Sequence, residues 1–163
     1  MASGRRALSI LARFVAFVAT ICAAILMGTS HQSVDLYTSS YEAKYTISQA
    51  FKYFVIVYSV ATAYGFLVIF LPAKSLLWRL VVAVDLVMTV LLTSGASAAV
   101  AVGHVAKNGN VQMGWAPICD RVPNFCDRVT VALAAGLVGI IIYLFSLFYS
   151  LHTALDPLLL IDK

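Results

Sequence analysis

Four long hydrophobic runs, separated by short polar segments, dominate the chain. They cover about residues 7–27, 51–71, 76–102 and 129–151. Each has the roughly 20 residues that an α-helix needs to cross about 30 Å of hydrocarbon. None shows the period-two polarity of a membrane β-barrel strand, and a helix satisfies its own backbone hydrogen bonds in lipid. The pattern predicts an all-α membrane protein: one domain, residues 1–163, folded as an antiparallel bundle of four transmembrane helices.

Composition supports a membrane protein. Of the 163 residues, 62% are hydrophobic and only 11% are charged, whereas a soluble domain carries about 25% charged residues. No segment between the hydrophobic runs exceeds 26 residues, which excludes a separate soluble catalytic domain. The basic residues form no stripe or cluster, so nucleic acid is not an expected partner.

The N-terminal run also invites a reading as a cleaved signal peptide, because Arg5 and Arg6 precede it. It is longer than a usual signal core, carries Arg13 inside and lacks an A-x-A-like site at its end, so we expect a retained span. Basic residues divide five against five between the two sides of the membrane, but they are denser on the side of the termini. Because charges beside the first span usually dominate, we expect both termini in the cytosol and outer loops at 28–50 and 103–128.

The first of these outer loops contains a regular repeat of tyrosines. Tyr37, Tyr41 and Tyr45 recur every four residues. This spacing suggests a short interfacial helix, and an irregular loop with scattered tyrosines is an equally good interpretation.

Two opposite charges lie inside the hydrophobic runs. At 1.5 Å per residue, Arg13 lies about 9 Å and Asp85 about 13 Å in from the cytosolic side. The first and third spans run parallel, so the two side chains can meet if these spans are neighbours, and a guanidinium can bind a carboxylate through two hydrogen bonds. We predict a structural ion pair. The alternatives are separate snorkelling to the headgroups and a proton relay, which would normally need more than one acid.

Small residues recur at helical spacing in three of the runs. Such rows let helix backbones approach closely in lipid. Packing within the bundle is the preferred interpretation, and binding of partner helices is the alternative. The predicted packing residues are Ala12, Ala16, Thr20, Ala24, Gly95, Ala99, Gly103 and Gly136.

Two cysteines, Cys119 and Cys126, lie in the longer outer loop. An oxidising outer compartment favours a disulfide between them. Free thiols and a zinc site with His104 are the alternatives, although the spacing fits no common zinc site.

Catalytic signals are weak. The three histidines are dispersed, and the chain has no phosphate-binding glycine loop, no H-E-x-x-H and no Ser/His/Asp ordering. We therefore expect no enzyme activity, no metal and no cofactor.

Several local motifs carry a resemblance to a known family. They are Arg13, Asp85-Leu86-Val87-Met88, Ser94-Gly95-Ala96-Ser97-Ala98-Ala99, Gly109-Asn110, Trp115-Ala116-Pro117-Ile118-Cys119, Phe125-Cys126 and Ala50-Phe51-Lys52-Tyr53-Phe54. Together they resemble the plant Casparian strip membrane domain proteins, and within them the CASP-like proteins, over essentially the whole chain. The family's Arg and Asp correspond to Arg13 and Asp85, its outer-loop cysteines to Cys119 and Cys126, and its outer-loop motif here includes Trp115, Pro117 and Phe125.

The resemblance implies a plasma-membrane protein with four spans, cytosolic termini and a MARVEL-like plan. Such proteins form homo-oligomers and hetero-oligomers with related four-span proteins, and the founding members build a scaffold that limits lateral diffusion and directs local cell-wall modification. The segment 31–49 lacks the Glu-Ser-Leu-Pro-type signature of the strip-forming members, so a broader CASP-like role is expected.

We therefore expect a non-enzymatic scaffold that contacts related subunits, membrane lipids and proteins on the cell-wall side. The main alternative is a small channel or transporter, or an auxiliary subunit of one. A four-span protein of vesicle traffic or cell junctions is a third.

Overall fold

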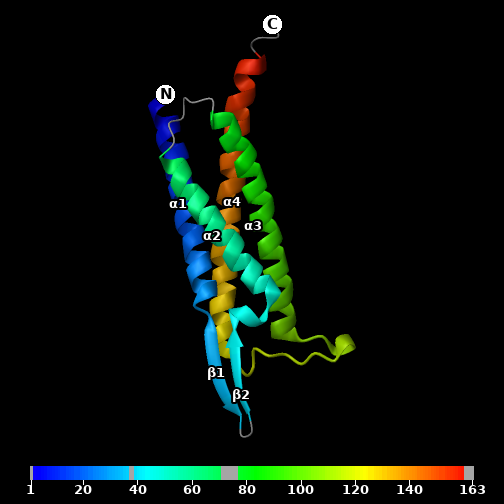
Figure 1. Ribbon diagram of the computed structural model, residues 1–163. Coiled ribbons are helices and arrows are strands. Elements are labelled where there is room, and N and C mark those ends of the chain that lie inside the picture. The colour runs from blue at the N-terminus through cyan, green and yellow to red at the C-terminus, as the bar shows by residue number, and fades with distance from the viewer. Residues whose placement is uncertain (1, 37–38, 71–76, 160–163) are drawn as a thin grey trace.

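The computed structural model describes residues 2–36, 39–70 and 77–159, with side chains described within 10–33, 44–70 and 80–152. Four long helices run antiparallel. The start of the first helix and the end of the last helix lie at the same end of the bundle (Figure 1). They are α1 (Ala2–Gly28), α2 (Gln49–Ile69), α3 (Leu77–Asn108) and α4 (Pro123–Leu159). Each contains a segment long and apolar enough to cross a membrane. The predicted all-α bundle with four membrane-spanning helices is confirmed.

Helices α3 and α4 extend beyond the hydrophobic runs that predicted them. The 37 residues of α4 would measure about 56 Å at 1.5 Å per residue, well beyond the hydrocarbon thickness. Pro123 at the first position of α4 suits a helix start, since proline has no N–H to satisfy there. Gly109 follows α3 with a φ of 67°, the left-handed conformation that commonly ends a helix. Local backbone signals, rather than the limit of hydrophobicity, thus set these boundaries.

The segment between α1 and α2 forms a β-hairpin, so neither an interfacial helix nor an irregular loop is correct. Strand β1 (His31–Leu36) pairs antiparallel with β2 (Ser39–Lys44), with His31 opposite Lys44. A short 3₁₀ helix, η1 (Tyr45–Ile47), then leads into α2. A spacing of four also returns to the same face of a strand, so the tyrosine repeat could not identify a helix. Tyr41 lies in β2, and Tyr37 lies outside the described residues.

The helices are arranged in a square. Helix α1 packs against α2 and α4, and α3 packs against the same two helices. Consequently α1 and α3 lie on a diagonal, whereas the sequence analysis assumed that an ion pair would need them to be neighbours. The two parallel helices α1 and α3 are therefore separated by α2 and α4, and are not adjacent as the predicted ion pair assumed.

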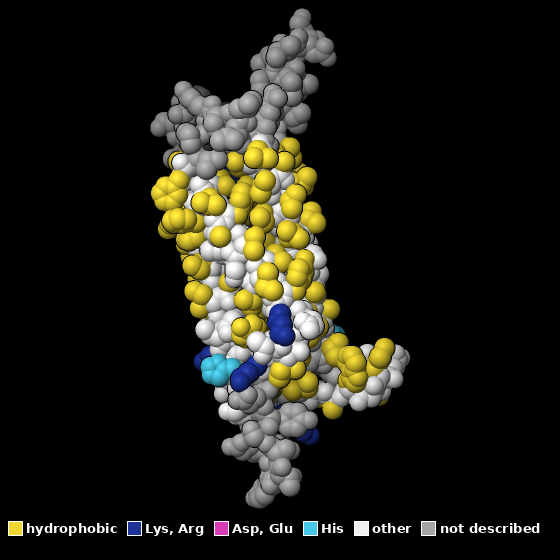
Figure 2. All heavy atoms as spheres, in the orientation of Figure 1, with side chains coloured by type: hydrophobic (Ala, Val, Ile, Leu, Met, Phe, Trp, Pro, Cys, Tyr) yellow, Lys and Arg dark blue, Asp and Glu magenta, His cyan; other side chains and the backbone are white. Residues whose placement is uncertain are grey.

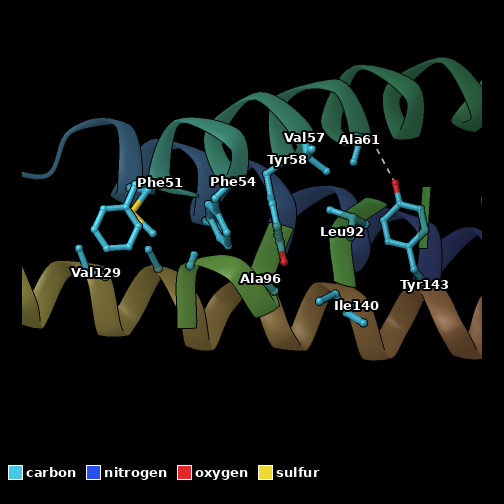
Figure 3. Close-up of a cluster of buried hydrophobic side chains, with 14 of the residues drawn as sticks. Phe51, Phe54, Val57, Tyr58, Ala61, Leu92, Ala96, Val129, Ile140 and Tyr143 are labelled. Carbon is cyan, nitrogen blue, oxygen red and sulfur yellow. Dashed lines mark hydrogen bonds between the residues drawn. The ribbon is translucent and has the colours of Figure 1, made fainter. Parts of the chain in front are cut away.

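Aromatic side chains of α2 fill the centre of the square (Figure 3). The rings of Phe54 and Tyr58 stack with their centroids 4.0 Å apart, and both residues are fully buried. A small residue on α4, diagonally opposite α2, makes room for them: a Cβ added to Gly136 would lie 2.7 Å from Tyr58 Oη and 3.0 Å from Phe54 Cζ. Large rings on one helix and a small residue on the helix that faces it across the square thus give close packing in the absence of water.

The outside of the bundle has the character expected of a lipid-facing surface. Figure 2 shows hydrophobic side chains over its middle, with Lys, Arg and His side chains near the end that carries the hairpin. In the described part of the chain, large exposed hydrophobic residues occur on all four helices. The surface thus separates an apolar band from one polar end.

Candidate functional site

A buried ion pair crosses the diagonal of the bundle. Arg13 Nη2 on α1 lies 2.7 Å from Asp85 Oδ2 on α3, and Nη1 lies 3.4 Å from Oδ1. The Asp85 side chain is 1% exposed and that of Arg13 is 11% exposed. The backbones of α1 and α3 do not pack against each other, but the long arginine side chain spans the distance between them. Both predicted residues are thus brought together, with geometry that opposes separate snorkelling.

One tyrosine connects this pair to α2, and a second joins α2 to α4. Tyr64 Oη on α2 lies 2.7 Å from Asp85 Oδ1 and 3.1 Å from the Val81 carbonyl oxygen. Because the hydroxyl has one proton, donation to the carboxylate is the stronger choice. Tyr143 on α4 donates to the Ala61 carbonyl on α2 at 3.1 Å (Figure 3). The ion pair and Tyr64 thus join α1, α3 and α2, and the separate Tyr143–Ala61 bond joins α4 to α2.

Neither tyrosine was predicted from the sequence as part of this site. A buried phenol usually finds a polar partner; Tyr64 and Tyr143 do so, whereas the buried Tyr58 hydroxyl has none. Their partners could not be assigned without knowing which helices adjoin.

The chemistry of the ion pair and Tyr64 favours a structural role, in which they fix the positions of the helices. The Asp85 carboxylate accepts from a guanidinium and a phenol, so its charge is both neutralised and hydrogen-bonded. Within the described ranges, no group of three or more His, Cys, Asp or Glu residues is placed to hold a metal ion. Such a saturated pair fixes helix positions, because removing either partner leaves a charge in a low-dielectric interior.

The predicted small residues lie mainly on the inward faces. Ala16, Thr20, Gly95, Ala99 and Gly136 are buried, and the remaining three, Ala12, Ala24 and Gly103, are partly buried. These positions agree with packing inside the bundle.

A second row of small and polar residues lies on the opposite face of α3. Ser94, Ser97, Ala101 and His104 are all exposed, at spacings of three or four residues that place them on one side of the helix. We call these four residues the outer α3 row. The sequence showed Ser94 and Ser97 only as flanks of the inward row, because no hydrophobic pattern says which face of a uniformly apolar helix meets lipid.

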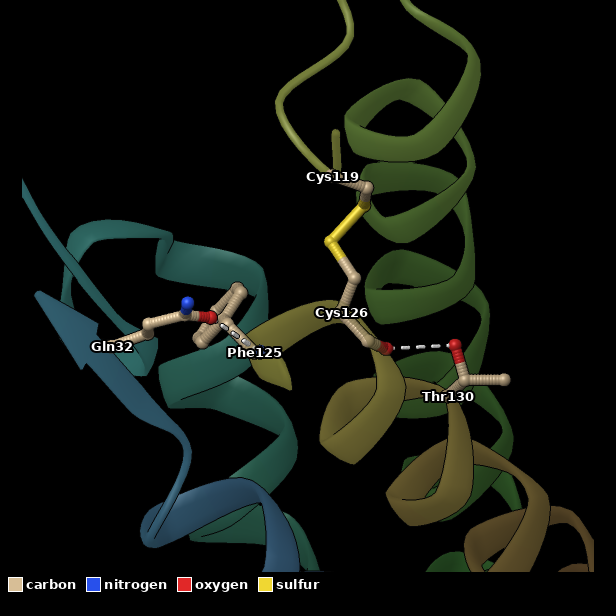
Figure 4. The surroundings of a disulfide bond; sticks show 5 residues. All are labelled: Gln32, Cys119, Phe125, Cys126 and Thr130. Atoms are coloured by element: carbon tan, nitrogen blue, oxygen red, sulfur yellow. Dashed lines mark hydrogen bonds between the residues drawn. A yellow bond between two sulfur atoms is a disulfide. The ribbon is translucent and has the colours of Figure 1, made fainter. Parts of the chain in front are cut away.

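The two cysteines of the α3–α4 region form a disulfide that joins the connection to the start of α4 (Figure 4). Cys119 and Cys126 have Cα atoms 5.7 Å apart. Since both sulfurs are in the bond, the zinc and free-thiol alternatives are wrong. His104 instead has its Nε2 atom 2.9 Å from Asn108 Nδ2.

Phe125, beside the disulfide, joins three outer elements. Its ring meets the Phe51 ring of α2 edge-on, with the ring centroids 6.2 Å apart. Its backbone N–H donates to Gln32 Oε1 of β1 at 3.0 Å (Figure 4). The other two motif residues, Trp115 and Pro117, are exposed. The motif therefore divides into one buried anchor and an exposed loop, and Gln32 is a partner that the sequence did not indicate.

Comparison with known proteins agrees with this architecture. The family described as "Casparian strip membrane protein domain" matches residues 2–142. "CASP-like protein 1C2" of Populus trichocarpa is 52% identical over 159 residues, covering 98% of both chains. "CASP-like protein 1C1" of Arabidopsis thaliana is 54% identical over 148 residues, covering 91% of this chain and 90% of the relative. No solved structure matches the chain. With its four membrane-spanning helices and near-complete coverage by these plant relatives, the chain belongs to the Casparian strip membrane protein family, among its CASP-like members.

Proposed function

We propose that this protein is a non-enzymatic scaffold of the plasma membrane that assembles with copies of itself or with related four-span proteins. The outer α3 row is the observation that carries the proposal. Hydroxyl-bearing and small side chains on a lipid-facing helix gain little from lipid, but they let a second helix approach closely and form hydrogen bonds with it. This row would supply the lateral contact between subunits.

The closed interior also favours a scaffold over a channel. Among the described residues, the charged groups inside the bundle pair across its diagonal, and aromatic rings pack the space beside them. A transport path needs polar groups that can exchange partners with a solute. The described interior instead consists mostly of fixed pairs and packed rings, and its two buried hydroxyls without a hydrogen-bond partner, those of Tyr58 and Ser146, are uncharged.

Membership of a family named for the Casparian strip supports a position at the cell wall. In this proposal both termini are cytosolic, and the disulfide and β-hairpin face the oxidising wall side. Assembled subunits would then limit lateral movement in the membrane and hold wall-side proteins in place.

Subunit counting tests the proposed contact. Protein carrying a fluorescent C-terminal fusion is extracted in native-lipid nanodiscs, and bleaching steps are counted in single particles. Ala101→Leu adds bulk to the outer α3 row, whereas Ala134→Leu makes the same change at an exposed position of α4. We expect several steps for the wild type and Ala134→Leu, and mostly single steps for Ala101→Leu. A wild-type protein that gives single steps, or equal losses in both variants, would contradict the proposal.

The channel alternative has a direct test of its own. Purified protein in liposomes should leave an imposed ion gradient unchanged, at the rate of protein-free liposomes. Faster dissipation that disappears on heating the protein would favour the channel.

A further inference from the structure

The connection between α3 and α4 carries an exposed apolar surface that the bundle does not use. Val111, Met113, Trp115 and Ile118 are 96%, 68%, 59% and 54% exposed. We call these four residues the apolar tip. Hydrophobic side chains this exposed and this close together usually mark a surface that meets a partner or a membrane.

The tip has a defined shape. Asn110 and Trp115 exchange both backbone hydrogen bonds, at 2.8 and 2.9 Å, around the 3₁₀ helix η2 (Val111–Met113). Asn110 Oδ1 also accepts from the Met113 N–H at 3.2 Å. Gly114, with a φ of 70°, takes the left-handed conformation that such a turn requires.

The base of the tip is equally fixed. A Cβ on Gly109 would lie 2.6 Å from the Trp115 carbonyl oxygen. The N–H groups of Ile118 and Cys119 both donate to the Ala106 carbonyl of α3, and the disulfide ties Cys119 to α4. The exposed side chains are therefore held outward by the backbone, so the tip is preorganised for a contact.

Its position matches the edge of the bilayer. The hydrophobic run of α3 ends near residue 102, and the 29-residue candidate membrane span ends at Asn108, three residues before Val111, so the tip follows closely after the apolar part of the helix. Figure 1 shows the connection leaving α3 sideways, while the β-hairpin continues away along the bundle axis. In Figure 2 the projecting part is hydrophobic and lies near the height of Lys and Arg side chains. A loop that leaves at this height and runs sideways remains beside the membrane surface.

The charges of the segment also fit a lipid interface. Between Asn108 and Cys119 the sequence has no charged residue, while Lys107 precedes it and Asp120 and Arg121 follow it. Tryptophan prefers the headgroup region, where its ring meets acyl chains and its N–H meets water or headgroups. A protein partner on the wall side would find this surface only by competing with the adjacent membrane.

We propose that the apolar tip inserts into the headgroup–acyl boundary of the leaflet opposite the termini and acts as a lateral anchor to lipid. The tip would then fix the tilt of the bundle and the depth of its outer end. This inference does not depend on oligomer formation, so it stands or falls separately from the scaffold proposal.

Tryptophan fluorescence tests the insertion, because the chain has only two tryptophans, Trp78 and Trp115. In the W78F protein, reconstituted at high lipid-to-protein ratio, Trp115 is the reporter. Lipids with bromine near the headgroup end of the acyl chain should remove most of its emission, and aqueous iodide should remove little. If W78F does not fold, subtracting the emission of W115F from that of the wild type gives the same signal.

A matched control places a tryptophan on the hairpin. Ser33 is exposed on β1, so S33W in the W78F/W115F background should respond to iodide and ignore brominated lipid. Trp115 emission that behaves like this control would place the tip in water and overturn the proposal. Protection from both quenchers would place it against protein, which would also overturn the proposal.

Discussion

Breaking the diagonal ion pair from either side should cost far more than removing it completely. The variants are Arg13→Met, Asp85→Leu and the double variant, which replace long or buried polar side chains by apolar ones of similar size. In Arg13→Met the carboxylate stays at a site where it is 1% exposed, with the Tyr64 hydroxyl still donating to it. In Asp85→Leu the guanidinium stays inside the bundle.

The magnitude follows from the burial of the pair. Removing one partner of a buried ion pair typically destabilises by about 3–5 kcal/mol, because the other charge is left uncompensated. Arg13→Met should lie near the lower end, because the stranded carboxylate keeps the hydrogen bond from the Tyr64 hydroxyl. The double variant leaves no charge behind and should lie within about 2 kcal/mol of the wild type. The two substitutions are thus expected to be strongly non-additive.

The free energy of unfolding is measured by titrating dodecyl sulfate into mixed micelles and following helical circular dichroism. The coupling is the difference between the double variant and the sum of the single variants. Additive effects would refute the reasoning, because they would mean that the two charges do not depend on each other. A negligible effect of Asp85→Leu would equally favour two side chains that reach the headgroups separately.

Four further substitutions test the surrounding contacts, each by the same titration. Tyr64→Phe removes a hydrogen bond to a charged group and should destabilise by about 1.5–3 kcal/mol; no change would mean that the carboxylate does not need the phenol. Gly136→Ala places a Cβ against Tyr58 and should cost about 1–3 kcal/mol, whereas Gly95→Ala, whose nearest neighbour would be 3.7 Å away, should cost less; the reverse order would contradict the packing. Cys126→Ser should cost about 2–3 kcal/mol on the chain-entropy model, with the loss disappearing when wild type and variant are compared under reducing conditions.

Hydrophobicity predicted the number and type of the membrane segments because every residue of a run contributes to it. It could not predict the order of the helices around the bundle. Depth along the membrane normal brought Arg13 and Asp85 to similar heights, but a sequence carries no measure of lateral position. The pair therefore forms by the reach of an arginine across a diagonal, rather than between adjacent helices.

The site could be predicted where a residue requires a partner whatever its neighbouring helices are. Two charges in lipid require compensation, and two outer cysteines favour a bond, so both pairs could be proposed from sequence. Tyr64 and Gln32 depend on which elements adjoin them, and neither partner could be assigned in advance. The β-hairpin was missed because its tyrosine spacing suits a strand as well as a helix.

Single-particle imaging of the protein in native lipid patches tests the proposed assembly most directly. The account predicts several copies that touch through the exposed face of α3, each with Arg13 against Asp85 and without a continuous aqueous passage within a copy. Isolated copies whose α3 faces meet only lipid, or copies arranged around a water-filled pore, would contradict it.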